Sequence, residues 1–252
     1  MPELRLEAVP PSREEVDYPL MREMHAATLL DTSEEVAAWR GEMRATAPAA
    51  VGELVPLAPF GDDAMPRDTI EEVILRRGST RRFRQDPISL AEFSTILDRA
   101  TRGIPVDFRP EAGAGLNEIY AIVNAVEGLR PGAYYYRAAE RALEVLKLGD
   151  FRRPAAYLGL EQDLPGDAAA AIFFLADLER VLARFGNRGY RAVQLEAGLL
   201  GGKMYLASYA QHVGTTGLTF YDDDVTAFFS PHAAGKSAIF LIAVGHAARR
   251  TT

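Results

Sequence analysis

Apolar side chains recur at helical spacing along the chain, after residues that favour helix starts. The pattern predicts helices over residues 16–30, over residues 70–77 and from Ser89 to about Thr101. A second N-terminal helix is predicted to end at Trp39. The predicted caps are Ser12 with Glu15, Asp31 or Ser33, Asp68, Ser89 with Glu92, and the acidic run that starts at Asp222.

Strand patterns follow in the second half of the chain. Residues 118–126 alternate β-branched and aromatic side chains with smaller ones, and residues 133–136 with 143–148 predict a hairpin. Residues 168–176 and 237–244 are short and apolar throughout, which predicts strands buried on both faces.

The longest helical pattern covers residues 191–213 and contains three glycines, at positions 198, 201 and 202. Glycine costs a helix about 1 kcal/mol relative to alanine, so their presence indicates close backbone contact with another element or a cofactor. Core packing alone is the alternative explanation. Residues 214–220 predict a turn or a short strand.

Residues 1–45 have helical patterns and few strand signals, whereas residues 46–67 are rich in Ala, Pro and Gly. The second stretch interrupts both periodicities and predicts an extended connector. We therefore expect residues 1–67 to form an N-terminal helical arm with a connector, and residues 68–252 to form the main domain.

Composition narrows the classes of function. The 252 residues are 48% hydrophobic and carry a net charge of −7, so a nucleic-acid partner is not expected. The absence of cysteine excludes disulfides and thiolate chemistry, and we expect a cytoplasmic protein that neither spans nor binds a membrane. The four histidines are scattered, and no metal site is expected.

A cluster of cations follows the helix predicted over residues 70–77. Four arginines at positions 76, 77, 81 and 82 surround Ser79, and Gly78 allows a ligand to approach the backbone. This combination predicts a phosphate clamp. A solvated basic helix end, favoured by the helix dipole, explains the same spacing.

Several familiar catalytic motifs are missing. The chain has no Gly-x-Ser-x-Gly elbow, no His-Glu-x-x-His and no Gly-x-Gly-x-x-Gly after a strand. Serine hydrolase, zinc protease and Rossmann assignments therefore have no support. An enzyme of this composition would need an organic cofactor.

The motif Arg77-Gly-Ser-Thr-Arg-Arg-Phe83 resembles the Arg-x-Ser-x-Arg-x-Phe opening of nitroreductase-like flavoproteins. Further stretches in the same order resemble the SagB-type dehydrogenase branch, which includes azoline oxidases of peptide natural products. These stretches are Pro110-Glu-Ala-Gly-Ala114, Gly128-Leu-Arg-Pro-Gly-Ala-Tyr-Tyr-Tyr136, Gly189-Tyr-Arg191, Leu195-Glu-Ala-Gly198 and Tyr205-Leu-Ala207.

The resemblance implies an α+β fold with a mostly antiparallel sheet flanked by helices, in a homodimer that binds FMN at the subunit interface. The helix of residues 191–213 would be the central dimer helix. Phosphate and ribityl contacts would come from Arg77, Ser79 and Arg81, and backbone amides near the isoalloxazine from residues 110–113 and 214–217. The full predicted FMN-binding set is Arg77, Gly78, Ser79, Arg81, Pro110, Glu111, Ala112, Gly113, Thr216, Gly217 and Arg249.

The chain also departs from the family pattern. Glu111 replaces a serine, and Leu199, Gly202 and Lys203 replace the usual His and Gln-Asn. Arg184-Phe185 stands where azoline oxidases have a Lys-Tyr pair, so two groups that exchange protons are lost.

The resemblance thus implies an FMN-dependent oxidoreductase that passes a hydride from a peptide-derived or other natural-product substrate to flavin N5. Tyr190, with Glu111 second, is the predicted proton-transfer group, and a core tyrosine is the alternative for Tyr190. Two other functions stay open: an NAD(P)H-dependent nitroreductase or quinone reductase, and a flavin-free scaffold subunit that binds partners in a biosynthetic complex.

Overall fold

A seven-stranded sheet in the order β1-β4-β3-β2-β5-β7-β6 forms the centre of the protein, and each strand pair is antiparallel. The computed structural model describes residues 9, 12–41, 49–104, 106 and 115–248. The strands are β1 (Leu54–Pro56), β2 (Glu118–Val123), β3 (Gly132–Arg137), β4 (Ala142–Leu148), β5 (Ala170–Ala176), β6 (Gly214–Leu218) and β7 (Ser237–Gly245). The expected α+β fold with a mainly antiparallel sheet is confirmed.

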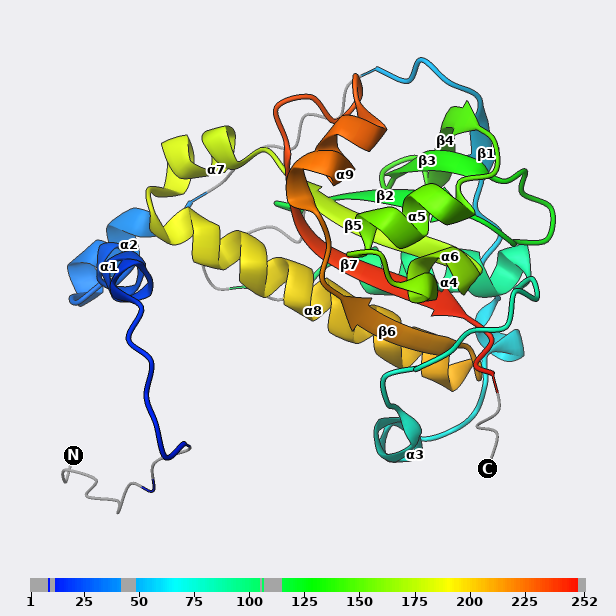
Figure 1. The fold of residues 1–252 in the computed structure, drawn as a ribbon, viewed down its shortest axis with the longest axis horizontal. Coiled ribbons are helices and arrows are strands. Elements are labelled where there is room, and N and C mark those ends of the chain that lie inside the picture. Colours follow the sequence, from blue (N-terminus) through cyan, green and yellow to red (C-terminus); the bar gives the residue numbers. More distant parts are fainter. Residues whose placement is uncertain (1–8, 10–11, 42–48, 105, 107–114, 249–252) are drawn as a thin grey trace.

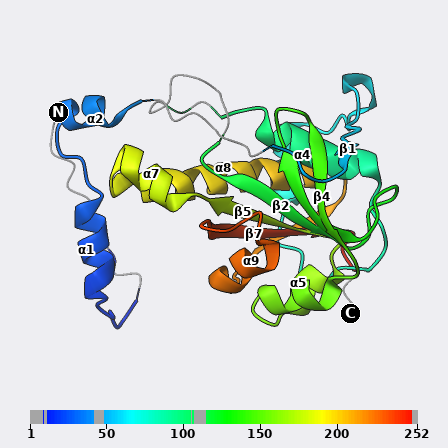
Figure 2. The same cartoon turned by 90° about the horizontal axis from the view of Figure 1, so that it is seen from above.

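Helices cover both faces of the sheet (Figure 1). Helices α4 and α8 lie on one face, and α5 and α9 lie on the other (Figure 2). The helices are α1 (Pro19–Ala27), α2 (Ser33–Trp39), α3 (Ile70–Arg76), α4 (Leu90–Thr101), α5 (Arg152–Leu158), α6 (Asp163–Asp167), α7 (Leu178–Phe185), α8 (Arg188–Ala210) and α9 (Asp222–Phe229), with a 3₁₀ turn η1 (Asp62–Ala64). Among the described residues, no helix is long and apolar enough to cross a membrane.

Strand β5 shows why the core has two layers. Ile172 and Phe174 belong to the apolar cluster beneath α4 and α8, whereas Phe173 and Leu175 belong to the cluster beneath α9. Alternate side chains of a strand point to opposite faces, so a continuous apolar run is required here. The prediction of a strand buried on both faces is confirmed, since every residue of β5 is buried.

Local capping rules placed some helix starts correctly and others wrongly. Ser89 caps α4 and forms the predicted capping box with Glu92. At α3 the cap is Thr69, one residue after the predicted Asp68, and at α2 it is Thr32. In both corrected cases the threonine hydroxyl accepts from the N–H of the third helical residue. That residue is a glutamate, and its carboxylate accepts from the threonine N–H.

Two predictions from the first third of the chain also need correction. Helix α1 begins at Pro19, a residue suited to the first position of a helix, and the Ser12 hydroxyl accepts from the Glu14 N–H in a local turn instead of capping a helix. The stretch expected as a connector supplies β1, in which Leu54 lies opposite Glu144 of β4. The division into an arm of residues 1–67 and a main domain stays a prediction.

The N-terminal helices attach to the start of α8 and stand away from the body of the protein (Figure 1). The Trp39 indole N–H donates to the Phe185 carbonyl oxygen at 2.8 Å, and the two rings lie 5.5 Å apart. The Arg188 and Arg191 guanidinium groups donate to the carbonyl oxygens of Thr28 and His25. These contacts fix α1 and α2 relative to α7 and α8.

Candidate cofactor site

The loop after α3 contains both buried and exposed residues. Thr80 and Phe83 are buried, whereas Ser79, Arg81 and Arg82 face solvent. Two buried residues therefore anchor a segment that presents cations and a hydroxyl to solvent.

Thr80 ties this loop to two other elements. Its N–H donates to the Thr215 carbonyl oxygen of β6 at 3.0 Å, and its hydroxyl lies 3.3 Å from the Tyr209 hydroxyl of α8. The residue at 214 is glycine because a Cβ there would lie 2.5 Å from the Thr80 hydroxyl oxygen. Sequence reasoning did not identify Thr80, Tyr209 or this close contact.

The C-terminal strand continues into the same region. The Arg84 N–H donates to the His246 carbonyl oxygen at 2.8 Å, and the Ala248 N–H donates to the Arg82 carbonyl oxygen at 2.9 Å. The backbone that carries the predicted cofactor residue Arg249 thus runs beside the arginine loop up to position 248. Arg249 itself lies outside the described residues.

Three of the four arginines of this cluster divide into two kinds. Arg76 bonds to other residues of the protein, because its guanidinium lies 2.6 Å from an Asp68 carboxylate oxygen and 2.8 Å from the Tyr209 carbonyl oxygen. Arg77 and Arg81 are exposed and pair with no carboxylate in the part of the chain that the structure describes. Their uncompensated charge favours an anionic ligand.

The fit to FMN can be tested at its phosphate end. The phosphate of FMN is an anion. The loop offers it the guanidinium groups of Arg77 and Arg81 and the Ser79 hydroxyl. A Cβ at Gly78 would meet only the Tyr209 hydroxyl, at 4.0 Å, so its backbone is open to a ligand. These residues fit a phosphate monoester.

The predicted ring-binding segment of β6 lies next to this loop. Thr216 is buried, and Gly217 packs closely, since a Cβ there would lie 3.1 Å from the Phe240 ring. The Gly217 N–H already donates to the Tyr205 hydroxyl oxygen at 2.5 Å. An amide contact from Gly217 to a flavin would have to replace that bond, and it stays a prediction.

The other predicted ring-binding residues, Pro110, Glu111, Ala112 and Gly113, lie outside the described residues. Both flanks of this segment are attached to α8. The Lys203 ammonium donates to the Gly103 carbonyl oxygen at 2.9 Å, and the buried Glu196 carboxylate accepts from the Asn117 N–H at 2.8 Å. Burial, together with the nearby charge of Arg102, lowers the pKa of Lys203.

Tyr190 lies far from the arginine loop. It is the third residue of α8 and 37% exposed, so it is not the buried core tyrosine of the alternative explanation. Tyr209 lies near the other end of the same helix, at a separation of about 28 Å for a rise of about 1.5 Å per residue. Within one chain, Tyr190 therefore does not reach the arginine loop.

Arg184 and Phe185, which differ from the family pattern, contact the N-terminal part of the chain. Phe185 is buried against Trp39, and the Arg184 guanidinium donates to the Arg40 carbonyl oxygen at 3.1 Å. Residues that stand in place of a Lys-Tyr pair thus hold the N-terminal arm. No group of three or more His, Cys, Asp or Glu side chains that could hold a metal ion occurs among the described residues.

Comparison with known proteins identifies similarity to nitroreductases. The model of the nitroreductase family matches residues 74–246. The chain is 29% identical over 163 residues to MJ1384 of Methanocaldococcus jannaschii, a protein named as a nitroreductase, covering 62% of this chain and 81% of that protein.

Among solved structures, a protein from Anabaena variabilis that is also named as a nitroreductase has a TM-score of 0.74 at 25% identity. The alignment covers 94% of this chain and 49% of that one, so this chain spans about half the length of that protein. A chain of the Escherichia coli microcin synthetase McbBCD complex, solved with truncated pro-MccB17 bound, shares the fold at 15% identity and a TM-score of 0.59, over 94% of this chain and 100% of that chain.

The family match starts inside α3, extends through the arginine loop, and ends after β7, where the chain pairs with that loop. It covers well over half of the 252 residues. Members of this family are oxidoreductases that typically bind FMN. The chain belongs to the nitroreductase family.

Proposed function

We propose that the chain is an FMN-dependent oxidoreductase of the SagB-like branch, acting on a peptide-derived or other natural-product substrate. The observation that carries the proposal is the arginine loop, in which Arg77 and Arg81 have no acidic partner among the described residues while Thr80 is anchored to β6 and α8. A rigid loop with uncompensated cations is suited to an anionic cofactor.

The roles at the phosphate end follow from this arrangement. Arg77 and Arg81 would hold the phosphate by charge-assisted hydrogen bonds, and Ser79 would add a hydroxyl donor. Arg249 would join them, since residue 248 pairs with Arg82. Bound FMN would supply the hydride acceptor for substrate oxidation.

At the ring end, Pro110 to Gly113 and the β6 residues Thr216 and Gly217 are the proposed contacts. Tyr205 holds the edge of β6 through the Gly217 N–H. Glu111 or Tyr190 would take the proton that the substrate loses when its hydride leaves.

The proposal includes a homodimer. Leu195 and Leu199 on α8 are 56% and 41% exposed, and added Cβ atoms at Gly198 and Gly202 would meet nothing within 4 Å. Small and apolar residues on one helix face allow a second helix to pack closely. A second copy would also explain how Tyr190, distant from the loop of its own chain, reaches a cofactor.

A nitroreductase or quinone reductase that uses NAD(P)H is the second candidate. It is favoured by the names of the M. jannaschii and A. variabilis proteins that the chain resembles. In this reading nicotinamide would reduce the flavin, and an open acceptor pocket would receive the electrons. Rapid anaerobic bleaching of the flavin by NADPH would support this candidate over substrate oxidation.

The deciding experiment is the visible spectrum of the purified protein, with added FMN. We expect an absorbance band near 450 nm from bound FMN. In Arg81→Ala, saturating this band should need about ten times more FMN. Arg130→Ala, which removes an exposed arginine paired with Glu53, is the matched control. A colourless protein that takes up no FMN would exclude the proposal and favour a flavin-free subunit of a complex, as the likeness in fold to a McbBCD chain suggests.

A further inference from the structure

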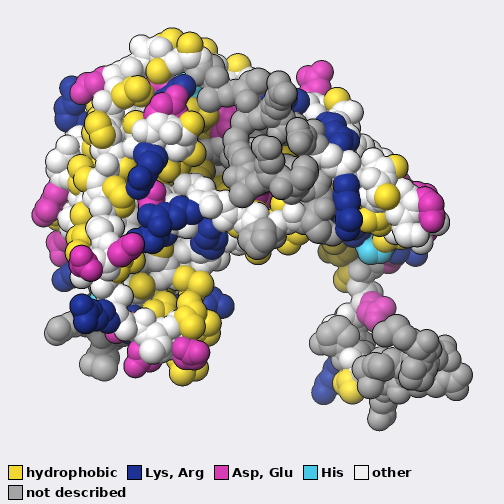
Figure 3. Space-filling model, turned by 180° about the vertical axis from the view of Figure 1, so that it is seen from behind, with side chains coloured by type: hydrophobic (Ala, Val, Ile, Leu, Met, Phe, Trp, Pro, Cys, Tyr) yellow, Lys and Arg dark blue, Asp and Glu magenta, His cyan; other side chains and the backbone are white. Residues whose placement is uncertain are grey.

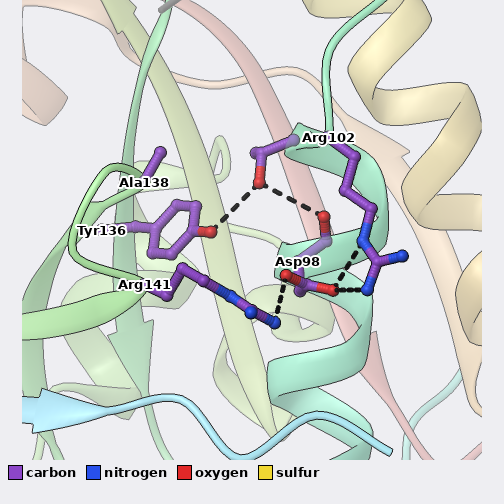
Figure 4. Close-up of a pocket in the computed structure, with 6 residues that line it drawn as sticks. Asp98, Arg102, Tyr136, Ala138 and Arg141 are labelled. Atoms are coloured by element: carbon purple, nitrogen blue, oxygen red, sulfur yellow. Dashed lines mark hydrogen bonds and ion pairs between the residues drawn. The ribbon is translucent and has the colours of Figure 1, made fainter. Parts of the chain in front are cut away.

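A pocket of about 260 Å³ lies between the last turn of α4 and the hairpin formed by β3 and β4 (Figure 4). It is separate from the arginine loop and shares no residue with it. The lining residues are Asp98, Thr101, Arg102, Tyr136, Ala138 and Arg141. Its volume suits a group of amino-acid size and is below that of drug-sized ligand sites.

One buried carboxylate organises the charges of this pocket. Asp98 is 5% exposed, and one of its oxygens accepts from the Arg102 guanidinium at 2.7 and 2.9 Å. The other oxygen lies 2.8 Å from an Arg141 nitrogen. Figure 4 shows both guanidinium groups held by the same carboxylate, from two different elements.

The pocket retains positive charge after these bonds. Two arginines against one aspartate leave one positive charge, and the arginine side chains are 50% and 55% exposed. Arg102 uses its Nε and one terminal nitrogen on Asp98, and Arg141 uses one terminal nitrogen, so donor groups remain on both.

The surroundings hold charges of both signs, since Arg99 and, to a smaller extent, Arg102 lower the pKa of the Asp62 carboxyl. Arg102 lies close enough to Lys203 for its charge to lower the pKa of that amine, after the larger effect of burial. Seen from behind Figure 1, the body presents Lys and Arg side chains together with Asp and Glu side chains (Figure 3). The residues that line the pocket therefore have a positive net charge, whereas the whole chain has a net charge of −7.

The remaining wall is less polar. The Thr101 hydroxyl donates to the Leu97 carbonyl oxygen at 2.8 Å, so the Tyr136 hydroxyl, 3.1 Å away, donates to Thr101. Both hydroxyl hydrogens are thus used internally, and the guanidinium groups are the free donors. The Tyr136 ring and Ala138 lie opposite Asp98 and Arg102 (Figure 4), which gives space for a short carbon chain.

We propose that this pocket binds a carboxylate carried on a short organic chain, such as a small carboxylic acid or an acidic side chain. The single excess charge matches a monoanion, and the Arg102 and Arg141 donors match carboxylate oxygens. This site goes beyond the proposed flavin chemistry and does not depend on it.

The test is titration of the purified protein with propionate at constant ionic strength, followed by NMR. We expect saturable binding to the wild type and about tenfold weaker binding to Arg141→Gln, because a hydrogen bond to a charged group is lost. Arg130→Gln, which alters an exposed arginine outside the pocket, should bind as the wild type does. Arg81→Ala should also retain binding, which separates this pocket from the arginine loop.

A second variant guards against a folding defect in Arg141→Gln. Ala138→Leu narrows the pocket without altering its charges, and it should also weaken propionate binding while the unfolding temperature is unchanged. Equal binding by the wild type, Arg141→Gln and Ala138→Leu, or no saturable binding by the wild type, would overturn the site. Tighter binding of inorganic phosphate, or equal binding of uncharged propionamide, would overturn its assignment to carboxylates.

Discussion

Thr80 has a role that its neighbours in the sequence do not reveal. Its side chain is buried between Gly214 of β6 and Tyr209 of α8, while the adjacent Ser79 and Arg81 face solvent. A binding group is effective when the residues beside it are held rigidly. Thr80 and Tyr209 are therefore positioning residues for the proposed phosphate contacts.

Replacing Tyr209 with phenylalanine tests this role. Loss of the hydroxyl that meets Thr80 should raise the dissociation constant of FMN about three- to tenfold, with little change in turnover once FMN is saturating. Fluorescence titration of the apoprotein measures the first quantity. Tyr221→Phe, a change at a partly exposed tyrosine of another region, is the control. FMN binding equal to that of the wild type would remove Tyr209 from the site.

His232 belongs to a second polar cluster, on the α9 side of the sheet. Lys236 donates to the Tyr120 hydroxyl oxygen at 2.9 Å, so that hydroxyl donates to the His232 Nδ1 at 2.8 Å. Burial and the charge of Lys236 lower the pKa of His232, and Arg137 acts in the same direction. Glu118 and Glu144 oppose them.

This depressed pKa predicts a pH dependence of stability. Below about pH 6.5 the unfolded chain binds a proton at this histidine that the folded chain does not, so the free energy of unfolding falls as pH falls. In His232→Asn the free energy of unfolding, measured by urea denaturation, should fall less between pH 7 and pH 5 than in the wild type. His212→Asn, at an exposed position, should keep the steeper slope. Identical slopes for the wild type and His232→Asn would contradict the prediction.

At the scale of elements, α8 connects the features of the site. Its C-terminal half contacts the arginine loop and β6 through Tyr209 and Tyr205, whose rings stack 6.5 Å apart. Its middle holds both flanks of the segment that contains Glu111, through Glu196 and Lys203. Its start holds the N-terminal arm. The helix therefore serves as a common support for these parts.

Trp39 should control how firmly α2 is held to α7. Trp39→Ala removes a ring contact and the hydrogen bond to Phe185, so hydrogen exchange of the α1 and α2 amides should speed up at least tenfold, while that of β5 is unchanged. Tyr18→Ala, at an exposed aromatic residue of the same arm, should have little effect. Unchanged exchange in Trp39→Ala would show that other contacts hold the arm.

At the scale of the whole molecule, the exposed face of α8 decides the expected assembly. Gly201 meets Phe240 and Ile242 within the chain, whereas Gly198 and Gly202 face open space. The close contact that the three glycines predicted is thus found for one of them inside the chain. A second copy would supply it for the other two.

Leu199→Asp tests this assembly. A charge placed in an apolar helix contact should dissociate a dimer into monomers and weaken FMN binding together with it, because the proposed site spans both copies. Light scattering after size exclusion measures the mass. Leu182→Asp, at a leucine of similar exposure on α7, should leave the mass unchanged. A monomeric wild type would refute the homodimer.

The sequence alone determined features that depend on residues close together in the chain. The capping box at Ser89 and Glu92 was correctly predicted, and so was a strand buried on both faces, predicted over residues 168–176 and found at residues 170–176. The strand follows from the apolar run, and the capping box follows from a bond between residues three positions apart. The arginine loop was found in the same way.

Only the tertiary structure decided how those residues are used. It shows that Arg76 is tied to Asp68 and Tyr209 while Arg77 and Arg81 stay unpaired among the described residues, and that Thr80 anchors the loop. It also formed the Asp98 pocket from two distant elements. These contacts join residues up to about 130 positions apart, and the sheet order and the packing of α8, not local pattern, bring such residues together.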